Sequence, residues 1–278
     1  MTIPPYFDAL IASFHRGATG RCVHLGYWDE PQCNDANHAI GEFLVAQRRL
    51  DEVLISMADL HDGQSILDVG CGFGGTLEWI DRQFARMLLT GVNIDSRQLD
   101  ICRQLSPTHD NHFNWEQADA CKLPFSANQF DRIFCVEAMF HFGSRRDFFL
   151  EAARVLVPGG TLVCSDINIM ASALTVDLPG FCIEAPLQDG YGPWPDFWSE
   201  DADHGVLSRF AGLVCSSTKD LTANTLPSYR YTSSSSADES RDPGTVSERA
   251  ALMLQWLHRH GHLRYQCFRF DKPAEKSP

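Results

Sequence analysis

Glu137 and His141 are the two residues of this sequence whose types and spacing best suit proton transfer. They follow the apolar run from Asp131 to Val136, which predicts a strand. One turn of helix after that strand would place both side chains on the same face. A histidine can accept a proton near neutral pH, because its ordinary pKa is about 6.5. The alternatives are a buried structural histidine and an acid that caps a helix.

A third acid, Asp166, lies at the end of a second apolar run, Thr161 to Ile167. Ligands of open α/β sheets bind where the carboxyl ends of parallel strands meet. Asp166 could therefore orient His141 or bind a hydroxyl group of a reactant, which makes all three residues candidates for catalysis. The sequence has no clustered set of His and Asp ligands, so we expect no metal.

The stretch from Asp68 to Gly75 joins a predicted strand, 65–69, to a predicted helix, 76–84. Glycines at 70, 72 and 74 allow a tight turn and a close approach of the backbone to a ligand. Their spacing differs from the G-x-G-x-x-G of dinucleotide-binding folds. Asp68 repels a phosphate and attracts a cation, so the pattern suits a positively charged cofactor that has no pyrophosphate.

This stretch resembles the first motif of the class I S-adenosylmethionine (SAM)-dependent methyltransferases, in which the acid and the glycines lie against the methionine part of SAM. Further stretches resemble the same family: Ala118-Asp119-Ala120 with Leu123-Pro124-Phe125, Glu137-x-x-x-His141, and Arg154-Val155-Leu156 with Pro158-Gly159-Gly160. The resemblance covers residues 20–272. It implies SAM as the cofactor and His141 as the proton acceptor, the usual role in the branches that methylate sugars and phenols.

The ribose and adenine of SAM are expected at the ends of the next two strands. Strand 87–92 ends at Asn93, where this fold commonly has an acid that binds the ribose. Asn93, Asp95, Ser96 and Gln98 are all candidates for that role, and the resemblance makes Asp119 the adenine contact. The residues expected to bind the cofactor are Tyr27, Asp68, Gly70, Cys71, Gly72, Gly74, Asn93, Ile94, Gln98, Asp119, Ala120 and Glu137.

Two aromatic segments are candidates for covering a substrate. Residues 23–29 resemble the His-Leu-Gly-Tyr-Trp segment of methyltransferases acting on antibiotic sugars, sterols, tocopherols and lipids, in which the tyrosine reaches the cofactor pocket. Residues 168–205 combine prolines and glycines, which exclude a long regular element, with many aromatic side chains. The residues expected to bind substrate are Trp28, Phe140, Phe181, Tyr191, Trp194 and Trp198. Packing on the edge of the sheet is the alternative.

Composition narrows the class of partner. The formal net charge of the 278 residues is -13, which opposes binding to nucleic acid or to an anionic membrane. The apolar runs are too short to span a bilayer, and the first residues lack the pattern of a signal peptide. The 10 cysteines are scattered without a C-x-x-C pair. They predict buried thiols in a reducing cytoplasm, not disulfides or a zinc site.

The order of predicted elements indicates an α/β fold, a Rossmann-like, doubly wound sheet of seven strands whose last strand is antiparallel in the family. Strands are expected at 65–69, 87–92, 113–117, 131–136, 161–167, 214–221 and 262–270. Helices are expected at 3–16, 35–60, 76–84, 96–105, 206–213 and 246–260, with one more capped by Ser144. Residues 1–60 should form an N-terminal helical arm or cap, and 61–278 the core with a lid at about 168–205. The polar tract 232–244 should be a mobile loop.

The function we expect is methyl transfer from SAM to a hydroxyl of a small, largely apolar natural product, with His141 as general base. The alternative is carbon methylation of a terpenoid- or sterol-like alkene through a cationic intermediate, with Glu137 as base. The acidic charge and the lack of an Asn/Asp-Pro-Pro-Tyr motif argue against a nucleic-acid methyltransferase. A regulatory SAM-binding module without catalysis is a further rival. The acceptor and the oligomeric state stay open, a homodimer being one option.

Overall fold

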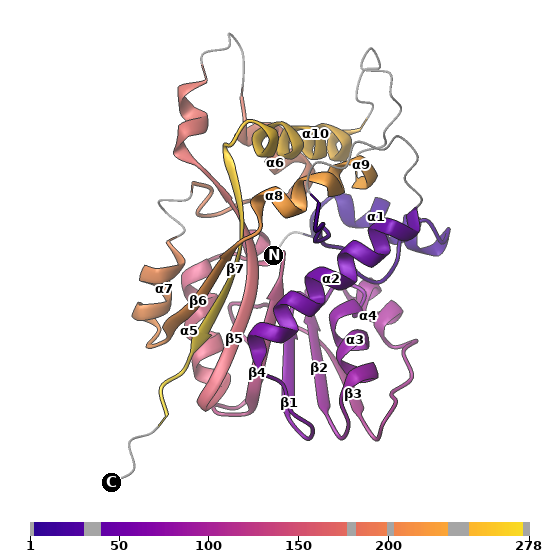
Figure 1. The fold of residues 1–278 in the computed structure, drawn as a ribbon, viewed down its shortest axis with the longest axis vertical. Coiled ribbons are helices and arrows are strands. Elements are labelled where there is room, and N and C mark those ends of the chain that lie inside the picture. Colours follow the sequence, from indigo (N-terminus) through magenta and orange to yellow (C-terminus); the bar gives the residue numbers. More distant parts are fainter. Residues whose placement is uncertain (1–2, 31–39, 177–181, 199–202, 233–244, 275–278) are drawn as a thin grey trace.

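The computed structural model describes residues 3–30, 40–176, 182–198, 203–232 and 245–274. Seven strands form one sheet in the order β3-β2-β1-β4-β5-β7-β6 (Figure 1). The strands are β1 (Ser65–Val69), β2 (Leu88–Asn93), β3 (His112–Gln117), β4 (Phe130–Val136), β5 (Leu156–Ile169), β6 (Val214–Asp220) and β7 (Leu263–Asp271). The predicted doubly wound, seven-stranded sheet is confirmed.

The strand directions place the carboxyl ends of the parallel strands side by side. β1 pairs in parallel with β2 and β4, β4 pairs in parallel with β5, and β7 runs antiparallel to both of its neighbours. Val69 lies opposite Val92, and Val136 lies opposite Ser165, so the parallel strands end together. The antiparallel last strand is confirmed. β5 starts earlier than predicted, at Leu156, because Pro158 to Gly160 continue the extended chain.

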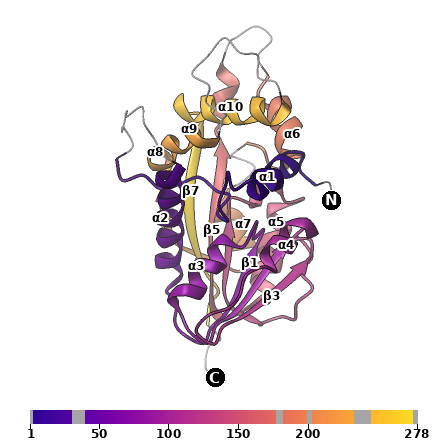
Figure 2. The same cartoon turned by 90° about the vertical axis from the view of Figure 1, so that its right-hand side faces the viewer.

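Helices cover both faces of the sheet, with α2 and α3 on one side and α5 on the other (Figure 2). Leu50 and Leu77 pack with Ile66 of β1 in one core, while Phe148 packs with Leu67 in a second core. Adjacent residues of β1 thus point to opposite faces, which explains its continuous apolar sequence. The helices that flank the sheet are α2 (Ile40–Ala58), α3 (Gly75–Gln83), α4 (Ser96–Cys102), α5 (Arg145–Val155) and α7 (His204–Phe210).

A second group of helices lies over the carboxyl ends of the strands, at the top of Figure 1. It comprises α1 (Tyr6–His15), α6 (Glu184–Tyr191), α8 (Thr222–Thr225), α9 (Tyr229–Thr232) and α10 (Val246–Arg259), with short 3-10 helices η1 (Met139–His141), η2 (Ala171–Thr175) and η3 (Leu226–Ser228). Helices α8 and α9 were not predicted, because each is a single turn of four residues. The tract 233–244 and Phe181 lie outside the described residues.

Helix α6 runs through Pro186 and Gly190, two residues that sequence analysis took as breakers. Pro186 lies in the first turn, where its missing N–H is not needed for the helix. Gly190 is where α6 meets α10, because a Cβ there would lie 2.3 Å from the Cβ of Ala250. The glycine therefore permits close helix packing, and the segment is more regular than its composition predicts.

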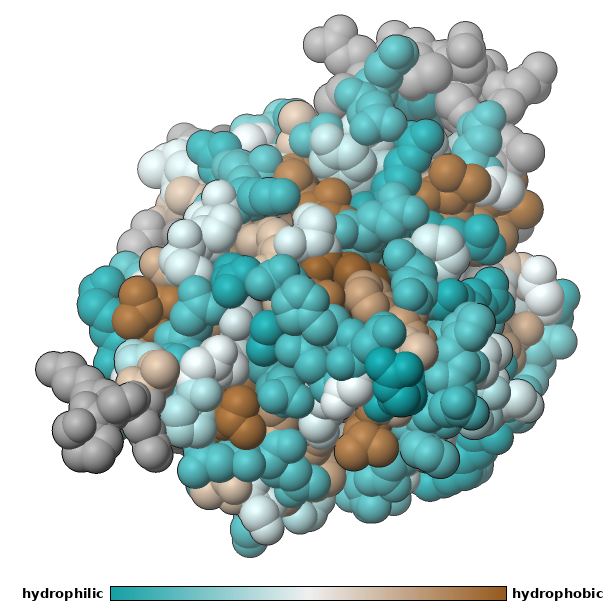
Figure 3. All heavy atoms as spheres, turned by 60° about the horizontal axis from the view of Figure 1, so that its bottom comes forward, coloured by the Kyte–Doolittle hydropathy of each residue, from teal (hydrophilic) through white to brown (hydrophobic). Residues whose placement is uncertain are grey.

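The surface at the bottom of Figure 1 lies at the end of the sheet opposite to these helices. Figure 3 shows it as mostly hydrophilic, with hydrophobic residues in small separate groups, as expected of a surface that meets water. Among the described residues, no helix combines the length and apolarity that crossing a membrane requires. The nine cysteines described are free thiols, and Cys71, Cys135 and Cys164 are buried as predicted. The prediction of buried thiols is wrong for Cys182 and Cys215, which are exposed.

Candidate active site

A pocket of about 760 Å³, its open mouth included, lies at the carboxyl ends of β1, β2 and β4. One part, the strand-end wall, consists of Gly70, Gly72, Asn93, Gln98 and Ala120, together with the neighbouring Ile94. The other, the aromatic wall, consists of Tyr6, Phe7 and His141, backed by Phe140 and Tyr191. Glu137 lies in the pocket between the two walls.

Backbone conformation explains two of the glycines in the strand-end wall. Gly70 has φ 81°, and a Cβ there would lie 2.4 Å from the Cβ of Ala138. Gly72 has φ 52°, and its Cβ would lie 2.8 Å from Val23. A side chain at either position would be strained and would also narrow the pocket. Both glycines line the pocket as expected, whereas Cys71 and Gly74 pack behind it.

Asp68 lies beneath the glycine turn and is only 2% exposed. Its Oδ1 is buried and has no hydrogen-bond partner among the described residues. Burial, together with the nearby charge of Asp51, raises the pKa of Asp68 to about 7. A buried carboxylate oxygen without a partner is costly unless a ligand supplies one. Asp68 does not line the pocket, but its unpartnered oxygen can accept a hydrogen bond from a ligand that binds against the glycine turn.

Asn93 and Gln98, two of the candidates for the ribose contact, form a hydrogen-bonded pair in the strand-end wall. Asn93 Nδ2 donates to Gln98 Oε1 at 3.1 Å, and Asn93 Oδ1 accepts from the Asp95 backbone N–H. Gln98 Nε2 is buried and has no partner among the described residues. Asp95 instead accepts from the backbone and side chain of Arg97, as the N-cap of α4. Among these residues, Gln98 offers the donor that is still unused.

The predicted adenine contact is divided between two residues. Ala120 lines the pocket. Asp119 does not line it, and its Oδ1 accepts a hydrogen bond from the Cys121 backbone at 2.7 Å. The carboxylate thus holds the turn after β3, and Ala120 is the part of that turn that faces the pocket.

Glu137 has a left-handed backbone, φ 47°, which is strained for a residue with a side chain. Because it is not helical, the predicted helical turn that would stack Glu137 on His141 is wrong; η1 starts only at Met139. Glu137 Oε1 accepts from the Leu25 backbone N–H and from the Tyr265 hydroxyl, both at 2.7 Å. Its backbone N–H donates to Ser165 Oγ at 3.1 Å, and that hydroxyl oxygen lies 3.0 Å from the Tyr265 hydroxyl.

Opposing influences act on the pKa of Glu137, and the net shift is upward. Burial raises its pKa, although the Tyr265 and Leu25 hydrogen bonds and the charge of His24 act in the opposite direction. Both bonds end on Oε1, which leaves Oε2 without a hydrogen-bond partner among the described residues. Tyr265 and Ser165 were not singled out in the sequence, because nothing local connects β7 with the end of β4.

His141 lies in the aromatic wall, and its Nε2 is 3.0 Å from the Tyr6 hydroxyl. Burial lowers its pKa to about 3, against a weaker opposing effect of the Tyr191 backbone. The ring is therefore neutral at pH 7 and has one nitrogen free of a proton. The pKa of His141 thus departs from the ordinary value of about 6.5, because the aromatic side chains around the ring exclude water.

Asp166 is fully buried and does not line the pocket. Its Oδ2 accepts from Arg145 Nε at 2.8 Å and from His204 Nε2 at 2.9 Å, and its Oδ1 accepts from the Ile167 backbone. The prediction that Asp166 orients His141 is wrong, since His141 bonds to Tyr6 and Asp166 bonds to Arg145 and His204. Arg145 also donates to the carbonyls of Pro195 and Asp196, so this ion pair anchors the segment after α6.

The predicted aromatic contacts lie around the pocket rather than in its wall. Trp194 stacks on Phe140 with ring centroids 4.5 Å apart, and Tyr191 meets Tyr6 edge-on at 5.1 Å. Trp198 packs on Phe197 at 4.9 Å.

Most of segment 23–29 also lies outside the wall of the pocket. The Trp28 Nε1 donates to Ser228 at 3.0 Å, away from the pocket, and Tyr27 packs against the main core. Val23 is the residue of this segment that reaches the pocket.

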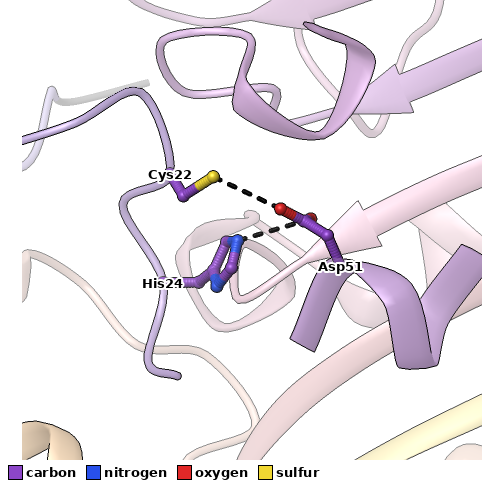
Figure 4. Close-up of side chains that lie close together, drawn as sticks. All are labelled: Cys22, His24 and Asp51. Atoms are coloured by element: carbon purple, nitrogen blue, oxygen red, sulfur yellow. Dashed lines mark hydrogen bonds and ion pairs between the residues drawn. The ribbon is translucent and has the colours of Figure 1, made fainter. Parts of the chain in front are cut away.

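A buried group of three residues fixes that segment (Figure 4). The Asp51 carboxylate accepts from Cys22 Sγ at 3.3 Å and from Thr76 Oγ1 at 2.8 Å, and lies 3.4 Å from His24 Nε2. Burial acts to lower the His24 pKa, but the charge of Asp51 outweighs it and raises that pKa. An imidazolium–carboxylate pair therefore accounts for the arrangement, although its spacing would also admit a metal ion. It ties residues 22–25 to α2 and so holds Val23 in place.

Comparison with known proteins agrees with this geometry. A family described as "Methyltransferase domain" matches residues 67–164. The methyltransferase GfsG of Streptomyces halstedii is 34% identical over 58% of this chain and 57% of its own length. The 27-O-demethylrifamycin SV methyltransferase of Amycolatopsis mediterranei (strain S699) is 33% identical, with 76% of this chain and 73% of that protein covered.

A solved structure also supports the fold. The crystal structure of a putative sarcosine dimethylglycine methyltransferase from Galdieria sulphuraria superposes with a TM-score of 0.73, covering 95% of this chain and 98% of that one. Its sequence identity is 22%, so this likeness concerns the fold alone.

Proposed function

This chain belongs to the class I SAM-dependent methyltransferases, and we propose that it methylates a hydroxyl group of a small, largely apolar natural product. The proposal rests chiefly on one observation. The His141 imidazole lies in the pocket wall, and its Nε2 is 3.0 Å from a hydroxyl group, that of the Tyr6 side chain. Relatives named as methyltransferases of antibiotics and as O-methyltransferases support the same class of acceptor.

The strand-end wall fits the cofactor. SAM supplies a methyl group on a positively charged sulfur, which is open to attack by a nucleophile. Gly70 and Gly72 leave room for a ligand against the backbone. Gln98 Nε2 is an unused donor for a hydroxyl oxygen, and Asp68 Oδ1 is an unused acceptor for an ammonium group. We propose these two residues as the ribose contact and the methionine contact.

His141 is proposed as the group that takes the proton of the acceptor. Its neutral ring can accept a hydrogen bond at Nε2, which aligns a hydroxyl oxygen before reaction. Its low pKa means that the ring does not hold this proton for long. We also propose that residues 3–30 form the cap, because α2 of the predicted arm 1–60 packs on the sheet instead, and that the described part of 168–205 covers the acceptor side.

Carbon methylation is the second candidate, and one observation favours it. Glu137 lies in the pocket with Oε1 held by two donors and Oε2 without a partner among the described residues. A carboxylate held in this way could stabilise a cationic intermediate and then accept its proton.

Replacing His141 separates the two candidates. His141→Ala should keep SAM affinity and lower turnover by about a hundredfold to ten-thousandfold, because a positioned base is lost. The measurement combines calorimetry with SAM and release of S-adenosylhomocysteine on a panel of metabolite acceptors.

Glu137→Gln is the matched control, since it keeps the shape of the side chain. If Glu137→Gln abolishes turnover while His141→Ala is mild, carbon methylation becomes the function. Normal turnover of both variants would remove both candidates.

A further inference from the structure

The Tyr6 side chain fills the space in front of His141. Its ring stacks on the imidazole with centroids 5.6 Å apart and planes 26° apart, and its hydroxyl is 3.0 Å from Nε2. The rings of Phe7 and Tyr191 meet the Tyr6 ring edge to face, with ring centroids 4.9 and 5.1 Å away. A phenol therefore occupies the position that the proposed reaction requires of an acceptor hydroxyl.

The shape of the space is that of one flat ring. The imidazole forms one face, Tyr191 forms an edge, and Phe140 continues the wall at 4.1 Å from the imidazole centroid. Edge-to-face and offset stacked contacts of this kind favour an aromatic ring over a saturated one of similar size.

The acidity of the hydroxyl points the same way. Burial lowers the His141 pKa to about 3, so the imidazole is a weak base. A phenol has a pKa of about 10. An aliphatic alcohol is closer to water, whose pKa is about 15.7. The mismatch between base and hydroxyl is thus several units smaller for a phenol, which lowers the cost of moving the proton.

Helix α1, which carries Tyr6, is attached through few strong contacts. Phe14 packs on Phe73 with centroids 4.9 Å apart. Asp8 pairs with Arg97 at 2.7 Å, but both side chains are largely exposed, at 76% and 48%. An exposed ion pair of this kind contributes little to stability. The helix can therefore give way to a ligand that competes with Tyr6.

We propose that the space filled by Tyr6 is the acceptor subsite and that the acceptor is a phenol, whose ring takes the place of the Tyr6 ring against His141. This inference rests on the proposed O-methylation. In the reaction the phenol oxygen forms a bond to the methyl carbon while the bond from that carbon to sulfur breaks. The sulfur keeps the electron pair, S-adenosylhomocysteine leaves, and the phenol proton passes to His141 Nε2 and then to water.

A side-chain deletion with a matching probe tests the subsite. Tyr6→Gly leaves a space shaped like 4-methylphenol, the side chain of tyrosine. We expect 4-methylphenol to bind this variant at least tenfold more tightly than the wild type by calorimetry, and to be converted to 4-methylanisole with SAM. The saturated analogue 4-methylcyclohexanol should not be methylated.

Tyr6→Phe is the control, because it keeps the ring and removes only the hydroxyl. It should leave the space filled and bind 4-methylphenol less tightly than Tyr6→Gly does. In a screen of larger acceptors, Tyr6→Phe should lower the KM of phenols, since the competing hydrogen bond to His141 is gone. This second measurement decides the matter if circular dichroism shows that Tyr6→Gly does not fold.

Three results would overturn the inference. They are binding of 4-methylphenol to Tyr6→Gly without methylation, equal methylation of 4-methylcyclohexanol, and an unchanged or raised KM of phenols with Tyr6→Phe. In each of them SAM still binds and His141→Ala is still impaired. Loss of SAM binding by the wild type would instead refute the proposed function itself.

Discussion

The strand-end wall and the aromatic wall face each other across one pocket, but they are built in different ways. The strand-end wall comes from consecutive strand–loop–helix units, and its hydrogen bonds are local: Gly70 N donates to Val92 O at 2.8 Å across adjacent strands. The aromatic wall joins residues far apart in the chain, such as Tyr6 and His141, which are 135 positions apart.

This difference suggests a division of labour. A wall made of backbone and small residues suits a constant ligand, because backbone geometry tolerates few changes. A wall made of packed side chains on separate helices can be altered one residue at a time. We therefore expect changes in the strand-end wall to affect SAM affinity and changes in the aromatic wall to affect the acceptor.

Asp166→Asn should have the largest effect, and it should act on stability. The change leaves the Arg145 charge buried without its carboxylate, which typically costs about 3–5 kcal/mol. It should also loosen the segment after α6, which Arg145 holds through the carbonyls of Pro195 and Asp196. Urea unfolding followed by circular dichroism measures the loss.

The pH dependence of this loss has a definite sign. Burial acts to raise the Asp166 pKa, but Arg145 and His204 outweigh it and lower that pKa. The ionised form therefore contributes stability above the unfolded pKa of about 3.9, and the contribution fades as pH falls below that value. Asp100→Asn, in an exposed pair with Arg103, is the control and should change nothing measurable. Normal stability of Asp166→Asn with lost turnover would instead support a catalytic Asp166.

Gly72→Val should weaken SAM binding by about a hundredfold, equivalent to roughly 2.7 kcal/mol. The new side chain meets Val23 and is forced into a left-handed backbone. Calorimetry with SAM measures the effect. Gly41→Ala is the control, because a Cβ at Gly41 meets no atom within 4 Å. Unchanged affinity in Gly72→Val would mean that the strand-end wall does not hold the cofactor.

SAM affinity should also fall about tenfold between pH 8 and pH 6. Burial raises the pKa of Asp68 to about 7 when the pocket is empty, so the residue is mostly protonated at pH 6. A cationic ligand favours the ionised form, and one pH unit below the pKa costs up to about a factor of ten. Asp68→Asn should bind weakly with a flat pH profile. The same slope in Asp68→Asn would assign the titration to another group.

The contrast between the walls also explains what the sequence could predict. Gly70, Gly72, Asn93, Gln98 and Ala120 were all expected, because each follows a strand whose periodicity is visible locally. The seven strands were likewise within reach of the sequence, and the resemblance to the family supplied the antiparallel direction of the last one.

Long-range packing accounts for the failures. Asp166 has the position of a catalytic acid in the sequence, but Arg145 and His204 reach it from two other elements. Tyr6 lies in the predicted amphipathic helix 3–16, but no local pattern indicates that its hydroxyl contacts His141. Side chains brought together by the tertiary fold leave no periodic signal.

Tyr265→Phe should give the smallest effect, about fivefold in turnover, and it examines the boundary between the two walls. Tyr265 comes from β7, yet its hydroxyl donates to Glu137 Oε1 at 2.7 Å and lies 3.0 Å from Ser165 Oγ. Removing one of the two donors to Oε1 costs about 1 kcal/mol and raises the Glu137 pKa further, because the ionised form loses a hydrogen bond.

If Glu137 acts as a carboxylate, the pH at which turnover rises should shift upward in Tyr265→Phe, while the KM for SAM stays the same. Ser56→Ala, which removes an exposed hydroxyl bonded only within α2, is the control. A fivefold loss without any shift of the pH profile would mean that Tyr265 supports the local structure alone. A loss confined to SAM affinity would place Glu137 with the strand-end wall and would sharpen the boundary in favour of His141 as the proton acceptor.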